Sequence, residues 1–130
     1  MNRLRRKRFP NEAEWFSFFE TEPDEGFERD MPIEYQDLTF RFENQEERFV
    51  ITMSLEMKEF YLKIVRKVEA KVSGIYDVKT VGRIDIKKDR QGEKELLLIL
   101  DDDRHRFITS IEITFLPSFC LMVKEHFSGE

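Results

Sequence analysis

Cysteine is nearly missing from this chain, which has a single one, Cys120, among its 130 residues. One cysteine excludes an intramolecular disulfide and favours a reducing compartment, so we expect a cytoplasmic protein. The chain also has only two histidines, His105 and His126, and it contains no Walker loop, dinucleotide fingerprint or G-x-S-x-G elbow. These shortages leave no usual zinc site, nucleophile triad or cofactor motif, and we expect no cofactor.

Long hydrophobic runs are missing too. No apolar stretch approaches the roughly 18 residues of a membrane-spanning helix. The N-terminus is basic, but the residues that follow it are mostly polar, which is unlike a signal peptide. We therefore expect no contact with a membrane, and a length that suits one domain.

The charges are divided unevenly along the chain. There are 22 Lys and Arg residues against 27 Asp and Glu, giving a net charge of −5, yet five basic residues fall within the first eight positions. We expect residues 1–9 to be a flexible basic arm, either solvated or a patch for nucleic acid, a membrane or an acidic surface, and residues 10–130 to be one acidic β-rich domain. Such a domain is a poor nucleic-acid binder but a plausible partner for another protein, in particular a basic one.

Alternating apolar and polar residues dominate the chain after residue 34. The longest alternation, Phe60–Val72, predicts one long strand paired by residues 47–57 and 78–88. Leu96–Leu100 is continuously apolar, which suits a strand covered on both faces, and residues 119–127 favour a strand over a helix. The fold class is therefore mainly β (α+β): a strongly curved antiparallel meander or open barrel of six to eight strands, with a short N-terminal helix.

That helix is expected over residues 11–20. Asn11 can cap it, and Glu14 stands three residues later, as in a capping box. Trp15, Phe18 and Phe19 share one face, which either packs on the sheet or forms an exposed aromatic patch. We favour packing, but keep the patch open as a binding surface.

Acidic side chains and these aromatic residues are the candidate contacts with a protein partner. The acids lie in the loop after the helix and in the run after Leu100, where they could instead be solvated turns. The candidate partner-binding residues are Trp15, Phe19, Glu22, Asp24, Glu25, Asp30, Asp101, Asp102 and Asp103.

Arg66 occupies an inward position of the longest alternation. An inward Arg needs a carboxylate or a polar cavity, so it could be the counter-ion of a small-ligand-binding barrel. A bulge at Arg66–Lys67, or a strand end, would instead turn it to solvent, and we favour that reading.

Two short motifs raise metal chemistry, and both are weak. Asp101, Asp102, Asp103 and His105 could hold a divalent cation but suit a hairpin turn better. Asp85–Ile86–Lys87 matches an element of metal-dependent nucleases, provided that Asp85 and Lys87 share a strand face. We expect no metal site, and keep a metal-dependent hydrolase as the last alternative.

The segment from Phe60 to Cys120 resembles small β-rich immunity proteins of bacterial polymorphic toxin systems. The resemblance is carried by Phe60–Val65, Val72–Ile75, Ile84–Ile86, Leu96–Asp101 and Ile111–Ile113, together with a preceding Trp-containing helix. It implies a non-catalytic inhibitor that neutralises a cognate toxin by covering part of its surface, and it carries over no functional residue.

Overall fold

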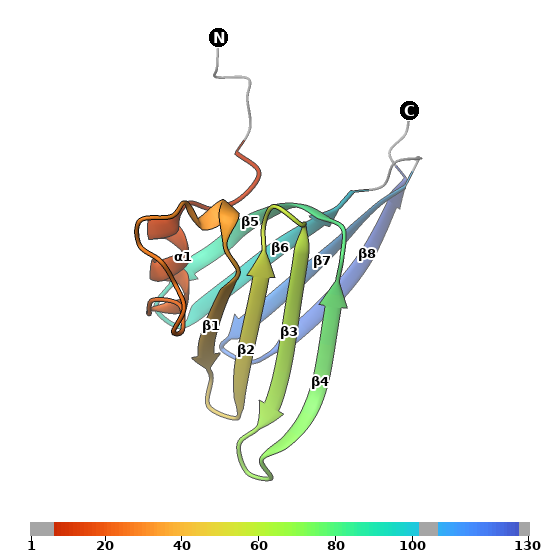
Figure 1. The fold of residues 1–130 in the computed structure, drawn as a ribbon. Coiled ribbons are helices and arrows are strands. Elements are labelled where there is room, and N and C mark those ends of the chain that lie inside the picture. The colour runs from red at the N-terminus through yellow and green to blue at the C-terminus, as the bar shows by residue number, and fades with distance from the viewer. Residues whose placement is uncertain (1–6, 102–106, 128–130) are drawn as a thin grey trace.

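The computed structural model describes residues 7–101 and 107–127, which form two four-stranded antiparallel sheets and a short helix (Figure 1). The mainly β class and the short N-terminal helix are thus confirmed, but the sheets are not closed into a barrel. The elements are α1 (Glu12–Phe19), the 3-10 turn η2 (Ile33–Tyr35), β1 (Leu38–Glu43), β2 (Glu47–Ser54), β3 (Glu59–Arg66), β4 (Lys71–Val78), β5 (Val81–Arg90), β6 (Glu93–Leu100), β7 (Phe107–Leu116) and β8 (Cys120–Phe127).

Each sheet is a meander in which sequence neighbours pair. The N-terminal sheet has the order β1-β2-β3-β4 and the C-terminal sheet has the order β5-β6-β7-β8. Short connections enforce this order, because antiparallel neighbours can be joined by tight hairpins. Figure 1 shows the N-terminal sheet in front of the C-terminal sheet, with the strands of the two sheets crossing at an angle. The core lies between them, where every second side chain of β2 and β3 is buried.

The predicted single strand over residues 60–72 is wrong. The chain ends β3 at Arg66, turns through residues 67–70 and returns as β4 from Lys71. Ala70 adopts a positive φ of 52° in this turn, and the Val68 side chain is 95% exposed. The prediction failed because Val68 and Ala70 continue the apolar alternation by residue type. The turn also contains none of the Gly, Pro or Asn residues that usually mark one.

Other strand predictions have mixed outcomes. Residues 120–127 do form a strand, β8. Of the segment 78–88, only Val78 pairs with β3, opposite Phe60, while the residues from Val81 onward pair with β6 in the other sheet. The run Leu96–Leu100 is covered on one face only: Leu96 and Leu98 are buried, whereas Leu97 and Ile99 are half-exposed on the outer face. An apolar run therefore did not require two covering layers here.

Helix α1 begins as its sequence predicts. The Asn11 side chain accepts a hydrogen bond from the Glu14 backbone N–H at 2.8 Å, and the Glu14 carboxylate accepts one from the Asn11 N–H at 2.8 Å. This capping box satisfies backbone donors that a helix start leaves free. The hydrogen bond from Lys7, helped by the one from the Asn11 backbone, lowers the pKa of Glu14.

The helix closes the edge of the sandwich formed by β1 and β5 (Figure 1). Its buried side chains join an aromatic cluster around Phe115, which is 0% exposed and lies with its ring centroid 5.0 Å from that of Phe49. Phe19 stacks on Phe40 with centroids 4.7 Å apart. Much of the unusual number of Phe residues, 13 in the chain, is thus used to fill one end of the core.

A buried lysine fixes the end of α1 to the C-terminal sheet. The Lys94 side chain is 4% exposed, and its Nζ donates to Asp89 at 2.5 Å and to the Ser17 carbonyl at 3.3 Å, with Glu20 Oε2 at 3.2 Å. The last turn of α1 has no basic residue of its own. Lys94 therefore supplies the cation that the carbonyl end of a helix favours.

Asp89 owes its inward position to irregular strand pairing. The register of β5 against β6 shifts between Ile86 and Lys88, which brings Asp89 opposite Lys94. Burial raises the pKa of Asp89, but hydrogen bonds from Lys94 and Ser17 and the charge of Lys94 together outweigh it and leave that pKa below its ordinary value. Asp89 is thus ionised at neutral pH.

The C-terminal part of the predicted basic arm lies on the body of the protein. Lys7 binds Glu14 at 2.6 Å, the Arg8 carbonyl accepts a hydrogen bond from the Ile84 N–H at 2.8 Å, and Phe9 packs against the core. Residues 1–6 lie outside the described residues. Across the described ranges, no helix has the length and apolarity needed to cross a membrane.

Candidate interaction surface

Two predicted aromatic contacts lie in the core. Trp15 is 0% exposed and Phe19 is 2% exposed, and the two rings stack with centroids 5.8 Å apart. The helix therefore uses its aromatic face for packing, the alternative that we favoured. Neither side chain has the surface that a partner-binding anchor requires.

Of the candidate acids in the loop after α1, Glu22, Glu25 and Asp30 are exposed and Asp24 is half-buried, and two of the four already have cationic partners. Glu22 makes a two-oxygen contact with the Arg29 guanidinium at 2.5 and 2.6 Å, and Asp24 binds Arg41 Nε at 2.7 Å. Glu25 and Asp30 are exposed, and no ion pair joins either to another described residue. Part of the acidic character of this loop is thus neutralised within the chain.

Asp101 directly follows β6 and lies beside Thr80, in the connection from β4 to β5 where the chain passes from one sheet to the other. Its carboxylate accepts a hydrogen bond from Lys58 Nζ at 2.5 Å, and its N–H donates to the Thr80 carbonyl at 2.7 Å. A Cβ on Gly82 would lie 2.0 Å from Asp101 Oδ1, so any other residue at position 82 would require this carboxylate to move. Asp102 and Asp103 lie outside the described residues, and so does the cation site predicted with them and His105.

Arg66 faces solvent at the end of β3. Its side chain is 61% exposed, and Nε lies 3.8 Å from Glu69 Oε1. The bulge predicted at Arg66–Lys67 is absent; the register of β3 against β4 instead shifts between Ile64 and Val65. The expectation of a strand end is met, and the inward Arg66 of the ligand-binding barrel is not found.

The nuclease-like element is interrupted by the β5 irregularity. The register shift between Ile86 and Lys88 breaks the alternation that was to place Asp85 and Lys87 on one face. Asp85 is also bonded to Arg83 Nε at 3.0 Å. Within the described residues, no three His, Cys, Asp or Glu side chains gather closely enough to hold a metal ion.

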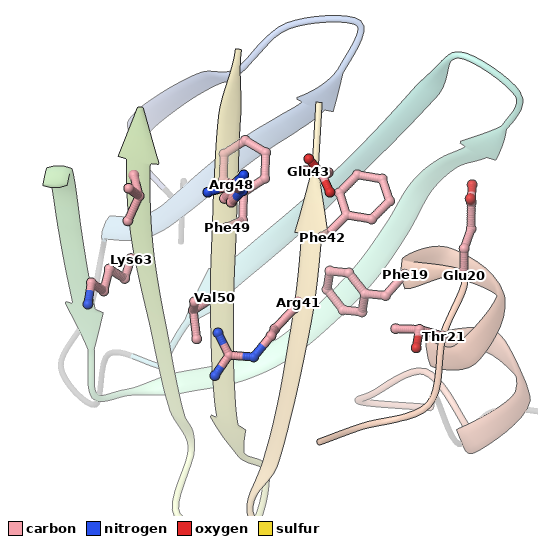
Figure 2. Close-up of a pocket in the computed structure, with 11 residues that line it drawn as sticks. Phe19, Glu20, Thr21, Arg41, Phe42, Glu43, Arg48, Phe49, Val50 and Lys63 are labelled. Atoms are coloured by element: carbon pink, nitrogen blue, oxygen red, sulfur yellow. The ribbon is translucent and has the colours of Figure 1, made fainter. Parts of the chain in front are cut away.

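A groove on the outer side of the N-terminal sheet was not predicted. It has a volume of about 620 Å³ and runs from the end of α1 over β1 to β3. Figure 2 shows Arg41 reaching from β1 across β2 below Val50, with Lys63 beyond it on β3. The register confirms this row, since Arg41 is opposite Val50 and Val50 is opposite Lys63. The only sequence signal was the residue type at outward strand positions, which we read as a solvated face.

The edge strands β4 and β8 carry most of the exposed apolar side chains on regular structure. No residue of β4 is buried, and none is buried in the part of β8 from Cys120 to His126. Cys120, the one thiol of the chain, is exposed. The exposed apolar residues of the two edges are Val72 (43%), Ile75 (55%), Tyr76 (37%), Met122 (45%) and Val123 (60%).

Comparison with known proteins adds a match in fold. No protein-family model and no curated protein matches the sequence. A chain of the contact-dependent growth inhibition toxin–immunity protein complex from Klebsiella pneumoniae 342 matches with a TM-score of 0.68 and 20% sequence identity. The match covers 92% of this chain and 97% of that chain, so the two share essentially the whole fold.

Proposed function

We propose that this chain is a non-catalytic inhibitor that binds another protein, and specifically an immunity protein that neutralises a cognate toxin. The observation that carries the proposal is the shared fold with a chain of a toxin–immunity protein complex, over nearly the full length of both chains. Independently, the sequence resembles small β-rich immunity proteins. A fold hosts many functions, so the proposal depends on an experiment and not on the likeness alone.

The proposed mechanism is occlusion of the toxin surface. The two sheets are joined by a filled core, so the outer faces are formed before a partner arrives. A preformed surface loses little conformational entropy on binding, which favours tight association. The net charge of −5 would speed the approach of a toxin that is basic overall.

We propose the cytoplasm as the place of action. The exposed single thiol of Cys120 supports this, because such a thiol persists in a reducing compartment and is prone to pairing between chains in an oxidising one. An immunity protein in the cytoplasm would meet a toxin after the toxin has entered the cell.

The test is co-expression with the polypeptide encoded by the gene immediately upstream in the source genome. We expect that polypeptide alone to stop growth of a host cell, this chain alone to be harmless, and the pair to grow normally. The purified pair should form a stoichiometric complex by size-exclusion chromatography. Growth arrest by this chain alone, or arrest that this chain does not relieve, would overturn the proposal.

A further inference from the structure

The outer face of the N-terminal sheet combines cations and apolar side chains in register. One row across the sheet is Arg41, Val50, Lys63 and Ile75, and the next is Glu43, Arg48, Val65 and Val72. We call these eight residues the basic–apolar face. Figure 1 shows no helix or strand over this side of the sheet.

The apolar side chains of this face lie on β2, β3 and β4: Val65 is opposite Val72 in the register, and Val50 and Ile75 lie in the adjoining row. Val50 and Val65 are half-buried among their neighbours, while Val72 and Ile75 on the edge strand are 43% and 55% exposed. Contiguous apolar area on a monomer surface, bordered by charged groups, is typical of a site that another protein covers.

The charged part is locally basic, although the chain as a whole is acidic. Arg48 and Lys63 have no carboxylate within 4 Å among the described residues, whereas Arg41 is bonded to Asp24. The one acid of the face, Glu43, binds Lys67 Nζ at 2.5 Å; this hydrogen bond and the Lys67 charge lower the pKa of Glu43, and the charge of Arg48, opposite it in the register, adds a smaller contribution. Two cations therefore remain available beside the apolar strip.

We propose that the basic–apolar face is the surface that contacts the toxin, and that the contacting segment of the toxin presents apolar side chains flanked by carboxylates. This inference rests on the proposed function and names the surface that performs it. Charge complementarity selects the occupant, because a carboxylate segment can pair with Arg48 and Lys63 while its apolar side chains cover Val65 and Ile75. Net charge acts at long range and local pairing at contact, so a toxin that is basic overall can still dock through such a segment.

The test uses three variants of the full chain and the polypeptide encoded immediately upstream as the probe. Lys63→Glu and Arg48→Glu reverse the free cations, and Ile75→Asp puts a charge into the apolar strip. We expect each to raise the Kd for that polypeptide by about tenfold or more, as disruption of an interface contact does. Fluorescence of the buried Trp15 should stay as in the wild type, which shows that each variant is folded.

Matched controls lie on the outer face of the C-terminal sheet. Lys124→Glu and Met122→Asp change the same residue classes on the edge strand β8, where Met122 is 45% exposed. We expect both to bind with the wild-type Kd. The reverse result, in which only the β8 variants weaken binding, would move the interface to the other sheet and overturn the inference while leaving the proposed function intact.

Two further experiments test whether RNA or a second copy of this chain, instead of the toxin, binds the face. The same variants are tested with a single-stranded RNA of about 20 nucleotides, whose phosphates could also pair with cations, and by sedimentation for self-association. If the wild-type chain binds the RNA and Lys63→Glu abolishes that binding, the face belongs to RNA and the inference is overturned. If the wild-type chain forms a dimer that Lys63→Glu separates, the face belongs to a second copy, and the inference is again overturned. Failure of the upstream polypeptide to bind even the wild-type chain would instead refute the proposed function.

Discussion

The two long edges of the sandwich are built in opposite ways. At the edge of β1 and β5, α1 covers the opening with Trp15, Phe18 and Phe19, each at most 2% exposed, and Lys94 bonds the helix end to the C-terminal sheet. At the edge of β4 and β8, no side chain of β4 and none of Cys120–His126 is buried. Stability is thus concentrated at the closed edge, which leaves the open edge and the adjoining basic–apolar face available for another molecule.

The largest expected effect contrasts a ring of the aromatic cluster that α1 packs against with a ring of the open edge. Phe115→Ala should destabilise the protein by about 3–5 kcal/mol, because it opens a cavity among the rings packed by the helix. Tyr76→Ala on β4 should cost about 1 kcal/mol or less, since that side chain is 37% exposed. Urea unfolding followed by circular dichroism measures both, and equal losses would contradict the contrast between the edges.

A smaller contrast concerns two lysines. Lys94→Met should cost about 2–3 kcal/mol, because it leaves the carboxylate of Asp89 half-buried without its cation and the end of α1 without its donor. Lys124→Met should change stability by about 0.5 kcal/mol at most, as its ion pair with Glu112 is exposed. The same unfolding assay applies, and a costly Lys124→Met would show that the open edge carries more of the stability than its burial suggests.

The smallest contrast appears only with pH. The folded pKa of Asp89 is depressed, so its charge stabilises the fold above the ordinary carboxyl pKa of about 3.9, and this contribution disappears as the pH falls through the lower folded value. The stability difference between wild type and Asp89→Asn should be constant from pH 8 to about pH 5 and shrink in acid.

The control for this pH experiment is Asp77→Asn at the open edge. Asp77 is 51% exposed beside Lys79, so screening by solvent should keep the stability of this variant within about 0.5 kcal/mol of the wild type. A difference for Asp89→Asn that persists unchanged in acid would mean that its carboxylate is not the stabilising group.

Local signals in the sequence were sufficient for the helix but not for its attachment. Asn11 and Glu14 lie three residues apart and fix the capping box by themselves. Lys94 lies on the inward face of β6 with Leu96 and Leu98, but Asp89 comes opposite it only because the β5–β6 register shifts between Ile86 and Lys88. Such a shift depends on pairing between strands, so the sequence pattern of one strand could not reveal it.

The candidate surface was missed for a related reason. Arg41, Val50 and Lys63 are 9 to 22 positions apart in sequence, and they become one row only when three strands align. Acidic loop residues were easier to see because they are consecutive, yet Glu22 and Asp24 turn out to be paired within the chain. Composition identifies charges, but only the fold shows which of them remain available to a partner.

Cys120 and Trp15 together allow a distance within the chain to be measured by fluorescence energy transfer. The single thiol is exposed on β8, while the single tryptophan, Trp15, is enclosed beneath the helix at the opposite edge. A dye attached to that thiol would accept excitation energy from the indole, with no residue added or removed. The efficiency of this transfer would report the distance between α1 and the start of β8, and would show whether a bound toxin changes that distance or leaves it in place.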